Sequence, residues 1–293
     1  MSGLKTVITG VIAFFTTLYM AVSTLLFSPV VHPPIEEKAQ DDIRILSFNI
    51  RCANVGIHQW DDRIGAVTGA IRAIAPDSFG VQEATPQWME ALREELPEYA
   101  DVGVGRDDGV NRGEFSAIFY LKDRYEGLDY GTFWLSETPD EPSSGWDASC
   151  KRICTWIVLK NKGTGAQYAH LNTHFDHLGI KARKNSADMI LAKAAEFDLP
   201  AVCTGDFNAV EFSSAYNRLV GGQLKNVKYS APDTMSAPTF NNGYNIKRFG
   251  AIYDHILIND GFEARVYRVV TEKFDGMLPS DHYPVYTDLS LVS

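Results

Sequence analysis

The sequence predicts an α/β domain with layered helices and strands of mixed direction, and three observations support this fold class. Short apolar runs rich in β-branched residues recur from residue 43 onwards, and each has the length of a strand. Segments with apolar residues at helical spacing separate several of these runs. Hydrophobic residues make up 45% and charged residues 22% of the 293 residues, which excludes a disordered, collagen-like or coiled-coil chain.

The expected elements alternate along the chain. Apolar residues from Ile64 to Ile74 predict a helix that Asp61 or Asp62 caps and Pro76 ends. A second helix is expected to begin at Thr85-Pro86, and a third spans Ala182–Phe197. The expected strands outnumber the helices and lie at Ile43–Ile50, Phe79–Val81, Phe115–Leu121, Trp156–Leu159, Tyr168–Asn172, Ala201–Thr204, Ile252–Ile258, Val266–Val270 and Val285–Leu291.

Residues 1–28 form a separate hydrophobic segment. Thr6 to Phe27 is an uncharged run of about 22 residues, long enough to cross the roughly 30 Å of bilayer hydrocarbon as a helix. Lys5 precedes the run and acidic residues follow it, so the positive-inside rule predicts a membrane anchor with the remaining chain extracytoplasmic. A cleaved signal peptide, and hence a secreted protein, is the alternative, because Ala21-Val22-Ser23 is a patch of small residues. Residues 29–42 then form a proline-containing linker to a domain over residues 43–293.

Charge and cysteine content limit the classes of function. The 27 Lys+Arg and 37 Asp+Glu give a net charge of -10. Proteins that bind long nucleic acid usually present a basic face to the phosphates, so a long duplex is not expected, although a short nucleic-acid end needs few contacts. Four cysteines are too few for a disulfide-built scaffold. Cys150 and Cys154 form either a local disulfide or free thiols, and Cys203 is expected in the core.

Polar side chains gather where the apolar runs end. Each cluster alone is compatible with a turn, a solvated acid or a structural histidine. Six clusters in one chain are hard to explain in that way, and strand ends at one edge of an α/β sheet hold side chains rigidly, so we expect a single site. The clusters are Asn49 with Arg51, Gln82 with Glu83, Asn172 with His174, Asp176 and His177, Asp206 with Asn208, Asp254 with His255, and Asp281 with His282.

Six motifs that contain these clusters occur in the order typical of one superfamily. They are Ser47-Phe48-Asn49-Ile50-Arg51, Val81-Gln82-Glu83-Ala84, Asn172-Thr173-His174-Phe175-Asp176, Thr204-Gly205-Asp206-Phe207-Asn208-Ala209, Tyr253-Asp254-His255 and Ser280-Asp281-His282-Tyr283-Pro284-Val285. The chain from about residue 43 to residue 291 therefore resembles the endonuclease/exonuclease/phosphatase superfamily of deoxyribonuclease-like, metal-dependent phosphoesterases. Residues 102–109, 113–116 and 133–139 are similar to one subgroup of its members. A departure from the family pattern is Ile252, where many members carry a basic residue.

The resemblance implies a four-layer catalytic domain, in which two packed mixed β-sheets are flanked by helices, and a role for each site residue. Asn49, Glu83 and Asp281 are expected at a Mg²⁺ or Mn²⁺ ion. Asp206 would activate or orient water, and Asn208 would bind a phosphate oxygen. The remaining catalytic candidates are His282 on the phosphate, Asp254 as its orienting carboxylate, and His174 on the phosphate or the leaving group.

The sequence leaves the identity of the metal ion and the residues that contact the substrate open. Oxygen donors without a cysteine cluster favour Mg²⁺, and zinc on His174, Asp176 and His282 is the other reading of the same donors. Arg106, Arg152 and Arg183 are candidates for clamping a substrate anion or are solvated surface residues, and Asp176 is grouped with them as a substrate candidate. Trp134 either stacks on substrate or belongs to the core.

Three functions follow. The favoured one is a Mg²⁺-dependent phosphatase or phosphodiesterase, tethered to the membrane through its N-terminal segment and acting on a small or lipid-linked phosphoester. The second is a nuclease or deadenylase-like 3′ exonuclease on RNA or DNA. The third is an inactive binding module, which predicts the loss of a metal or base residue, yet all these residues are present. We expect the protein to be a monomer.

Overall fold

The computed structural model describes residues 14, 34–53, 58–241, 244 and 250–292. The predicted hydrophobic helix over residues 1–28 lies outside the described residues, apart from Phe14. Within the described ranges, no helix is both long enough and apolar enough to span a membrane. The chain divides into two units, Met1–His32 and Pro33–Ser293, and all the elements below belong to the second.

Residues 34–42, in the segment that the sequence assigns to a linker, contact the domain. Lys38 Nζ lies 2.5 Å from Asp77 Oδ2. Arg44 Nη2 donates to the backbone oxygen of Glu36 at 2.9 Å. The described part of this segment is therefore attached to the domain by hydrogen bonds.

One mixed sheet has seven strands. Their order is β10 (Asp233–Met235), β12 (Phe262–Val269), β13 (Val285–Leu291), β1 (Ile43–Asn49), β2 (Ser78–Gln82), β4 (Ile118–Leu121) and β3 (Tyr99–Val102). At the centre, β1 runs parallel to β2 and antiparallel to β13, with Asn49 opposite Gln82 and Ser47 opposite Val285. All seven residues of β1 are buried, as expected for a strand covered on both faces.

The second mixed sheet has six strands. Their order is β5 (Tyr125–Trp134), β6 (Ile153–Asn161), β7 (Gln167–His174), β8 (Ala201–Asp206), β11 (Asp254–Ile258) and β9 (Lys225–Asn226). β7 runs parallel to β8, and β11 runs antiparallel to it. The register places His174, Asp206 and Asp254 opposite one another on three adjacent strands.

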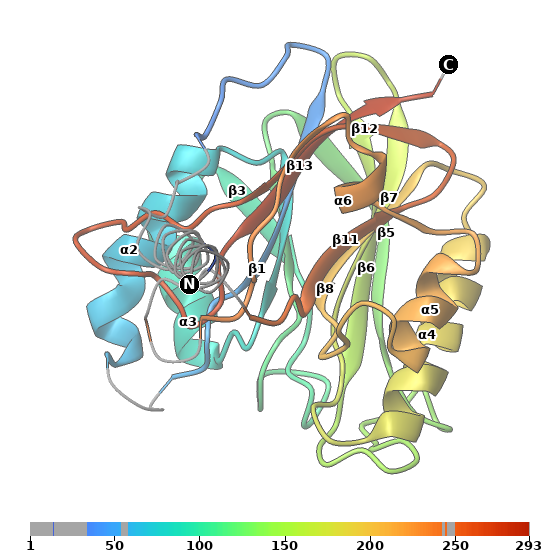
Figure 1. Cartoon of the computed structure of the whole chain (residues 1–293). Helices are drawn as coiled ribbons and strands as arrows, with labels where there is room; N and C mark the ends of the chain where they lie inside the picture. Colours follow the sequence, from blue (N-terminus) through green and yellow to red (C-terminus); the bar gives the residue numbers. More distant parts are fainter. Residues whose placement is uncertain (1–13, 15–33, 54–57, 242–243, 245–249, 293) are drawn as a thin grey trace, which may run out of the picture. The chain divides into compact units, whose positions relative to one another are not determined.

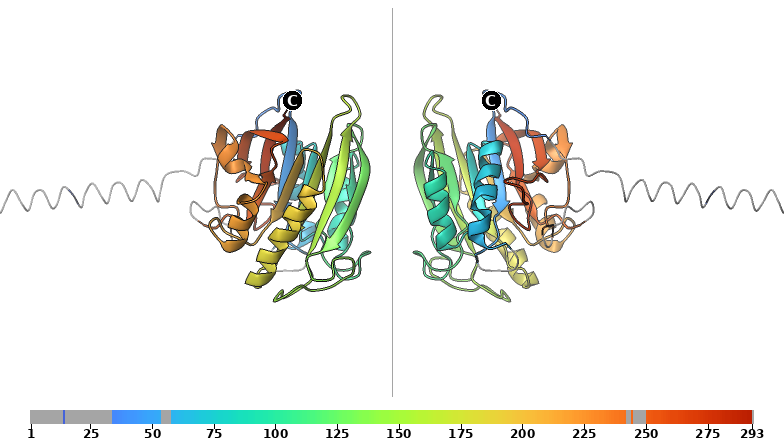
Figure 2. Two further views of the ribbon diagram at one scale, coloured as in Figure 1. Left: turned by 90° about the vertical axis from the view of Figure 1, so that its right-hand side faces the viewer. Right: turned by 90° about the vertical axis from the view of Figure 1, so that its left-hand side faces the viewer.

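Helices cover the outer faces of both sheets (Figures 1 and 2). α2 (Trp60–Ile74) and α3 (Pro86–Glu95) lie on the seven-stranded sheet, and α4 (Ile180–Ala195) and α5 (Ser214–Val220) lie on the six-stranded sheet. α6 (Val227–Ser230) is a single turn. Successive side chains of β1 point to opposite faces of the sheet. Ile45 therefore packs between the sheets, whereas Leu46 packs beneath α2.

The two packed mixed sheets flanked by helices confirm the predicted fold class. Several boundaries differ from the prediction. The strand expected from Phe115 begins at Ile118, because the ladder with β2 starts where Gly80 pairs with Ile118. The strand expected from Ile252 begins at Asp254, and the third helix begins and ends two residues earlier than expected. The N-cap of α2 is Gln59, whose backbone N–H donates to Asp62 Oδ2 at 3.2 Å.

Six elements were not predicted: β3, β5, β9, β10, α5 and α6. The longest of them, β5, is an edge strand, and every position from Glu126 to Phe133 is partly or fully exposed. Its glycines and a register shift between Gly127 and Asp129 interrupt the alternation by which a strand is recognised.

Candidate active site

The ends of neighbouring strands from both sheets meet at one edge. Asn49 ends β1, and its Nδ2 atom donates to Asp206 Oδ2 at the end of β8, over 3.0 Å. The same nitrogen donates to Glu83 Oε1, directly after β2, at 3.0 Å. One amide therefore joins the carboxylates of both sheets. The eight residues predicted to act in catalysis or metal binding all lie in this cluster: Asn49, Glu83, His174, Asp206, Asn208, Asp254, Asp281 and His282.

A cavity of about 310 Å³ opens at this edge. Its lining combines carboxylates, imidazoles and two guanidinium groups. The residues are Glu83, Arg106, Glu114, Cys150, Arg152, His174, His177, Asp206, Asn208, Phe240, Asp281 and His282. Asn49 and Asp254 are fully buried and hydrogen bond to lining residues. The lining is therefore strongly polar and holds both signs of charge.

The backbone is in a sparsely populated conformation where two site residues leave their strands. Glu83 has φ 60° and Asn208 has φ 44°. Cys52 N–H donates to Glu83 Oε2 at 2.8 Å, and Asn208 N–H donates to Asp206 Oδ1 at 2.9 Å. Left-handed backbone is uncommon at residues other than glycine, and the hydrogen bonds to these two carboxylates help to offset its cost.

Asp206 lies between two histidines. Its Oδ2 atom is 3.5 Å from His174 Nε2 and 3.8 Å from His282 Nε2. Burial raises the pKa of Asp206 to about 7, with the charge of Asp254 adding to the shift and His282 opposing it. A carboxylate with a pKa near neutrality exchanges a proton readily at physiological pH.

The two histidines differ in charge. His282 Nδ1 is 2.8 Å from Asp254 Oδ2. Burial disfavours the imidazolium form, but the carboxylates of Asp254 and Asp206 raise the pKa of His282 to about 10. Burial, followed by the positive charges of Arg152 and Arg106, lowers the pKa of His174 well below its ordinary value. The cavity therefore combines an imidazolium with a neutral imidazole, on opposite sides of one carboxylate.

The donor set fits a hard divalent cation. Burial raises the pKa of Asp281, and the charge of Glu83 adds to this shift. Although burial opposes ionisation, hydrogen bonds from Asn49 and Cys52 hold the pKa of Glu83 below its ordinary value. Carboxylates crowded in this way repel one another unless a cation offsets their charge, and oxygen donors suit Mg²⁺ or Mn²⁺.

Possible ligand atoms of Glu83, His174 and Asp206 all lie within 4.8 Å of one another, as do those of Asp206, Asp254 and His282. Among the described residues, the set His174, Asp176 and His282, which the sequence allowed for zinc, does not form such a group.

The four substrate candidates occupy different places. Arg152 and Arg106 line the cavity, and Arg106 makes a two-pronged ion pair with Glu114 at 2.7 and 3.0 Å. Asp176 and Arg183 are not among the described residues that line the cavity. Arg183 Nη1 instead donates to the backbone oxygen of Asp176 at 2.8 Å.

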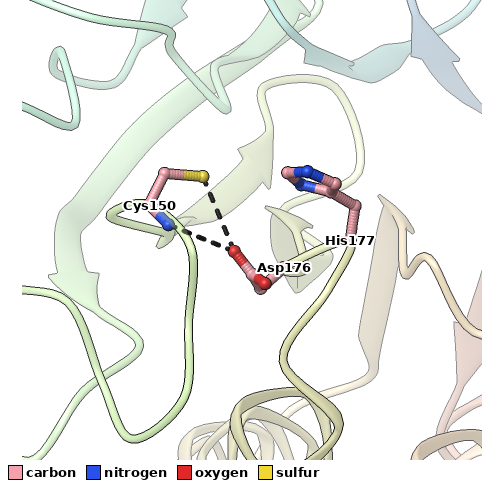
Figure 3. Close-up of side chains that lie close together, drawn as sticks. All are labelled: Cys150, Asp176 and His177. Carbon is pink, nitrogen blue, oxygen red and sulfur yellow. Dashed lines mark hydrogen bonds between the residues drawn. The ribbon is translucent and has the colours of Figure 1, made fainter.

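Asp176 organises the wall of the cavity. Figure 3 shows its carboxylate between Cys150 and His177. Oδ2 accepts from the backbone and hydroxyl of Ser149 at 3.0 and 2.8 Å, and Oδ1 accepts from the backbone of Gly179 at 2.7 Å. Although burial opposes ionisation, these bonds hold the pKa of Asp176 below its usual range. The carboxylate thus ties the segment before β6 to the segment after β7.

The cysteines are free thiols. Cys150 lines the cavity, whereas Cys154 packs in the core beside α4, so the disulfide that the sequence left open is not formed. Cys203 lies in the same core, as expected. Trp134 is buried, and its Nε1 donates to the backbone oxygen of Arg106 at 2.8 Å.

Residues 46–282 match the Endonuclease/Exonuclease/phosphatase family. The chain belongs to this family. A mannosyl-6-phosphatase of Bacteroides thetaiotaomicron is 36% identical, with a TM-score of 0.82 over 85% of this chain and 100% of that one. An endonuclease/exonuclease/phosphatase from Bacteroides vulgatus is 38% identical, with a TM-score of 0.82 over 86% of this chain and 99% of that one. The catalytic domain of human Nocturnin, at 18% identity, a TM-score of 0.70 and coverage of 90% and 100%, shares the fold.

Members of the endonuclease/exonuclease/phosphatase family hydrolyse phosphoesters with the help of divalent metal ions. The chain is accordingly a metal-dependent phosphoric ester hydrolase. The predicted superfamily is therefore confirmed, and so is the prediction of an enzyme.

Four cavity residues of this family member were given no role from the sequence: Glu114, Cys150, His177 and Phe240. A topological signal was available for Glu114. It stands directly before the apolar run that contains β4, and β4 is antiparallel to β2, so the start of β4 lies at the edge where β2 ends. For Cys150 and Phe240, which lie in loops, no pattern in the sequence indicates their position.

Proposed function

We propose that the protein is a Mg²⁺-dependent phosphatase that releases inorganic phosphate from a small phosphomonoester. The observation that carries this proposal is the single cavity in which Glu83 and Asp281 lie beside the Asp206–His282 pair. A cavity of about 310 Å³ is at the lower end of the size range of small-molecule sites. Similarity to a mannosyl-6-phosphatase supports a phosphorylated sugar as the first substrate class to test.

Glu83 and Asp281, with Asn49 beside them, would hold the metal ion. Bound there, Mg²⁺ would supply positive charge to the phosphoryl oxygens and to the charge that develops during hydrolysis. Neighbouring groups direct Glu83, since Asn49 and Cys52 donate to its two carboxylate oxygens.

Asp206 would orient the attacking water and accept its proton. Burial raises the pKa of Asp206, which makes its carboxylate a stronger base than an exposed aspartate. His282, held in one orientation by Asp254, would place its positive charge against a phosphate oxygen. Asn208 Nδ2 lies 3.1 Å from His174 Nε2, and these two side chains would form the polar wall on the other side of the phosphorus atom.

The test is a substrate panel offered to the purified full chain with Mg²⁺, with Mn²⁺ and with a chelator. The panel holds mannose 6-phosphate, other phosphomonoesters, sphingomyelin, a phosphodiester, RNA and DNA. We expect the protein to release phosphate from sugar phosphates. The chelator should abolish this release. Faster cleavage of RNA, DNA or the diester would overturn the proposal.

Two variants accompany the panel. Asp206→Asn and His282→Ala are each expected to lower the rate on the best substrate by orders of magnitude while the protein remains folded. Asp188→Asn is the matched control, because Asp188 is exposed on α4 and pairs with Arg218 at the surface. A near-native rate for either site variant would contradict the proposed roles.

We further propose that residues 1–28 attach the enzyme to a membrane with the catalytic domain on the export side, or direct its secretion, and that the domain is a monomer. The uncharged run from Thr6 to Phe27 supports the first part. A reporter fused to the C-terminus tests the topology, and cytoplasmic reporter signal would contradict it. Light scattering of the purified protein tests the oligomeric state, and a dimer mass would contradict a monomer.

A further inference from the structure

Arg152 is a buried cation with unused hydrogen-bond donors. Its side chain is 6% exposed, and in the described part of the chain neither Nε nor Nη1 has a hydrogen-bond partner. A buried guanidinium normally has its donors satisfied, because leaving them without partners costs free energy. Arg152 therefore lacks a ligand that would complete its hydrogen bonding.

The neighbours of Arg152 contact one edge of its guanidinium group. Nη2 lies 3.2 Å from His177 Nδ1, and Nε lies 3.7 Å from Asp176 Oδ2. That oxygen already accepts hydrogen bonds from the backbone and hydroxyl of Ser149. One edge of the guanidinium is thus held by His177 and Asp176, two of the side chains drawn in Figure 3, which leaves Nη1 and the second hydrogen of Nη2 for another acceptor.

The second arginine of the cavity differs in this respect. Both terminal nitrogens of Arg106 donate to the carboxylate of Glu114. The charge of Arg106 is therefore offset within the protein. Of these two arginines, Arg152 is the one with a terminal nitrogen, Nη1, that has no hydrogen-bond partner in the described part of the chain.

Arg152 lies close to the groups proposed to act on the phosphoryl group. It lines the same cavity as His174, Asn208 and His282. Its charge lowers the pKa of Glu83 on one side and of His174 on the other. An anion bound by Arg152 would accordingly be the reacting group of the substrate rather than a distant substituent.

We propose that Arg152 binds the phosphoryl group of the substrate through two parallel hydrogen bonds and thereby selects phosphomonoesters over phosphodiesters. This inference rests on the proposed phosphatase function. A monoester phosphoryl group is a dianion with three non-bridging oxygens, and the planar fork of an arginine matches two of them. A diester is a monoanion with only two non-bridging oxygens, and the proposed metal ion and His282 would draw on the same two atoms, so a diester would leave a donor of Arg152 unsatisfied in a buried place.

The experiment compares p-nitrophenyl phosphate with bis(p-nitrophenyl) phosphate at saturating Mg²⁺. We expect the wild-type protein to favour the monoester. Arg152→Gln should lower kcat/KM for the monoester by about 100-fold and for the diester by less than about 3-fold. Arg152→Lys keeps the charge without the fork and should lose about 10-fold on the monoester. Arg218→Gln, an exposed arginine on α5, is the control and should leave both rates unchanged.

A second measurement does not depend on turnover. Titration of the wild-type protein with orthophosphate should show binding that Arg152→Gln weakens by about 100-fold, whereas dimethyl phosphate, a monoanion, should bind both proteins equally weakly. Because binding is measured without turnover, the result still tests Arg152 if a variant has low activity for another reason.

The outcomes separate this inference from the proposed function. Equal losses on the two substrates, or orthophosphate binding that does not change in either variant, would overturn the role of Arg152 and leave the phosphatase proposal standing. A wild-type preference for the diester would overturn both. A monoester-specific loss together with weakened orthophosphate binding supports the inference.

Discussion

The Nδ1 atom of His282 lies 2.8 Å from Oδ2 of Asp254, and this hydrogen bond joins the two sheets at the site. Asp254 begins β11 in the six-stranded sheet, whereas His282 precedes β13 in the seven-stranded sheet. Asp254 is fully buried, and within the described ranges its other oxygen has no partner. The carboxylate therefore fixes the ring of His282 so that Nε2 is directed to Asp206, 3.8 Å away.

We expect Asp254→Asn to lower kcat by about 10²- to 10⁴-fold with a small effect on KM, because an amide no longer stabilises the charged imidazole in this orientation. Steady-state kinetics on the best substrate of the panel measure the effect. Asp260→Asn, at a side chain that is 83% exposed, is the control. A kcat close to that of the wild type would mean that Asp254 has no part in orienting His282.

Removing the charge of Glu83 should weaken metal binding. We expect Glu83→Gln to raise the Mg²⁺ concentration for half-maximal activity by about 10-fold or more, since hard cations prefer charged oxygen ligands. Activity is measured over a Mg²⁺ titration, and binding of Mn²⁺ is followed by calorimetry. Glu90→Gln is the control, because Glu90 is exposed on α3. An unchanged Mg²⁺ requirement would exclude Glu83 as a ligand.

Much of the site could be predicted because its residues follow buried strands. β1 is rich in apolar residues, and Asn49 is the polar residue that ends it. The contact between Asn49 and Asp206 could not be predicted locally, since the two residues are 157 positions apart and meet through the packing of two sheets. The family resemblance supplied that information, because it places distant motifs in one fold.

The arginines show where sequence reasoning ends. Arg106, Arg152 and Arg183 were equivalent candidates, and nothing in their sequence context distinguishes them. In the structure Arg106 is paired with Glu114, and Arg183 donates to a backbone oxygen. Which arginine keeps free donors depends on the loops before β6 and after β7, whose conformations depend on tertiary hydrogen bonds.

Gly80 lies where the two sheets approach closely. A Cβ atom there would be 2.3 Å from Asn172 Oδ1 and 2.4 Å from Thr204 Oγ1. We expect Gly80→Ala to lower the free energy of unfolding by about 1–3 kcal/mol. Gly69→Ala is the matched control inside α2, where the nearest atom would be 3.7 Å away, and it should stabilise by up to about 1 kcal/mol. Denaturant unfolding measures both, and equal effects would contradict the close approach at Gly80.

His170 should make the stability of the domain depend on pH. It is fully buried between the sheets, with Nδ1 3.0 Å from Ser78 Oγ and Nε2 3.0 Å from Thr204 Oγ1. Burial lowers the pKa of His170 to about 3. Below about pH 6.5 the unfolded chain protonates this residue and the folded protein does not, so stability falls as pH decreases from 6.5 toward 3. The free energy of unfolding should therefore drop by about 2 kcal/mol more between pH 7 and pH 5 in the wild type than in His170→Gln. Urea unfolding at the two pH values measures the difference, and parallel pH dependences would show that His170 is not held neutral by the fold.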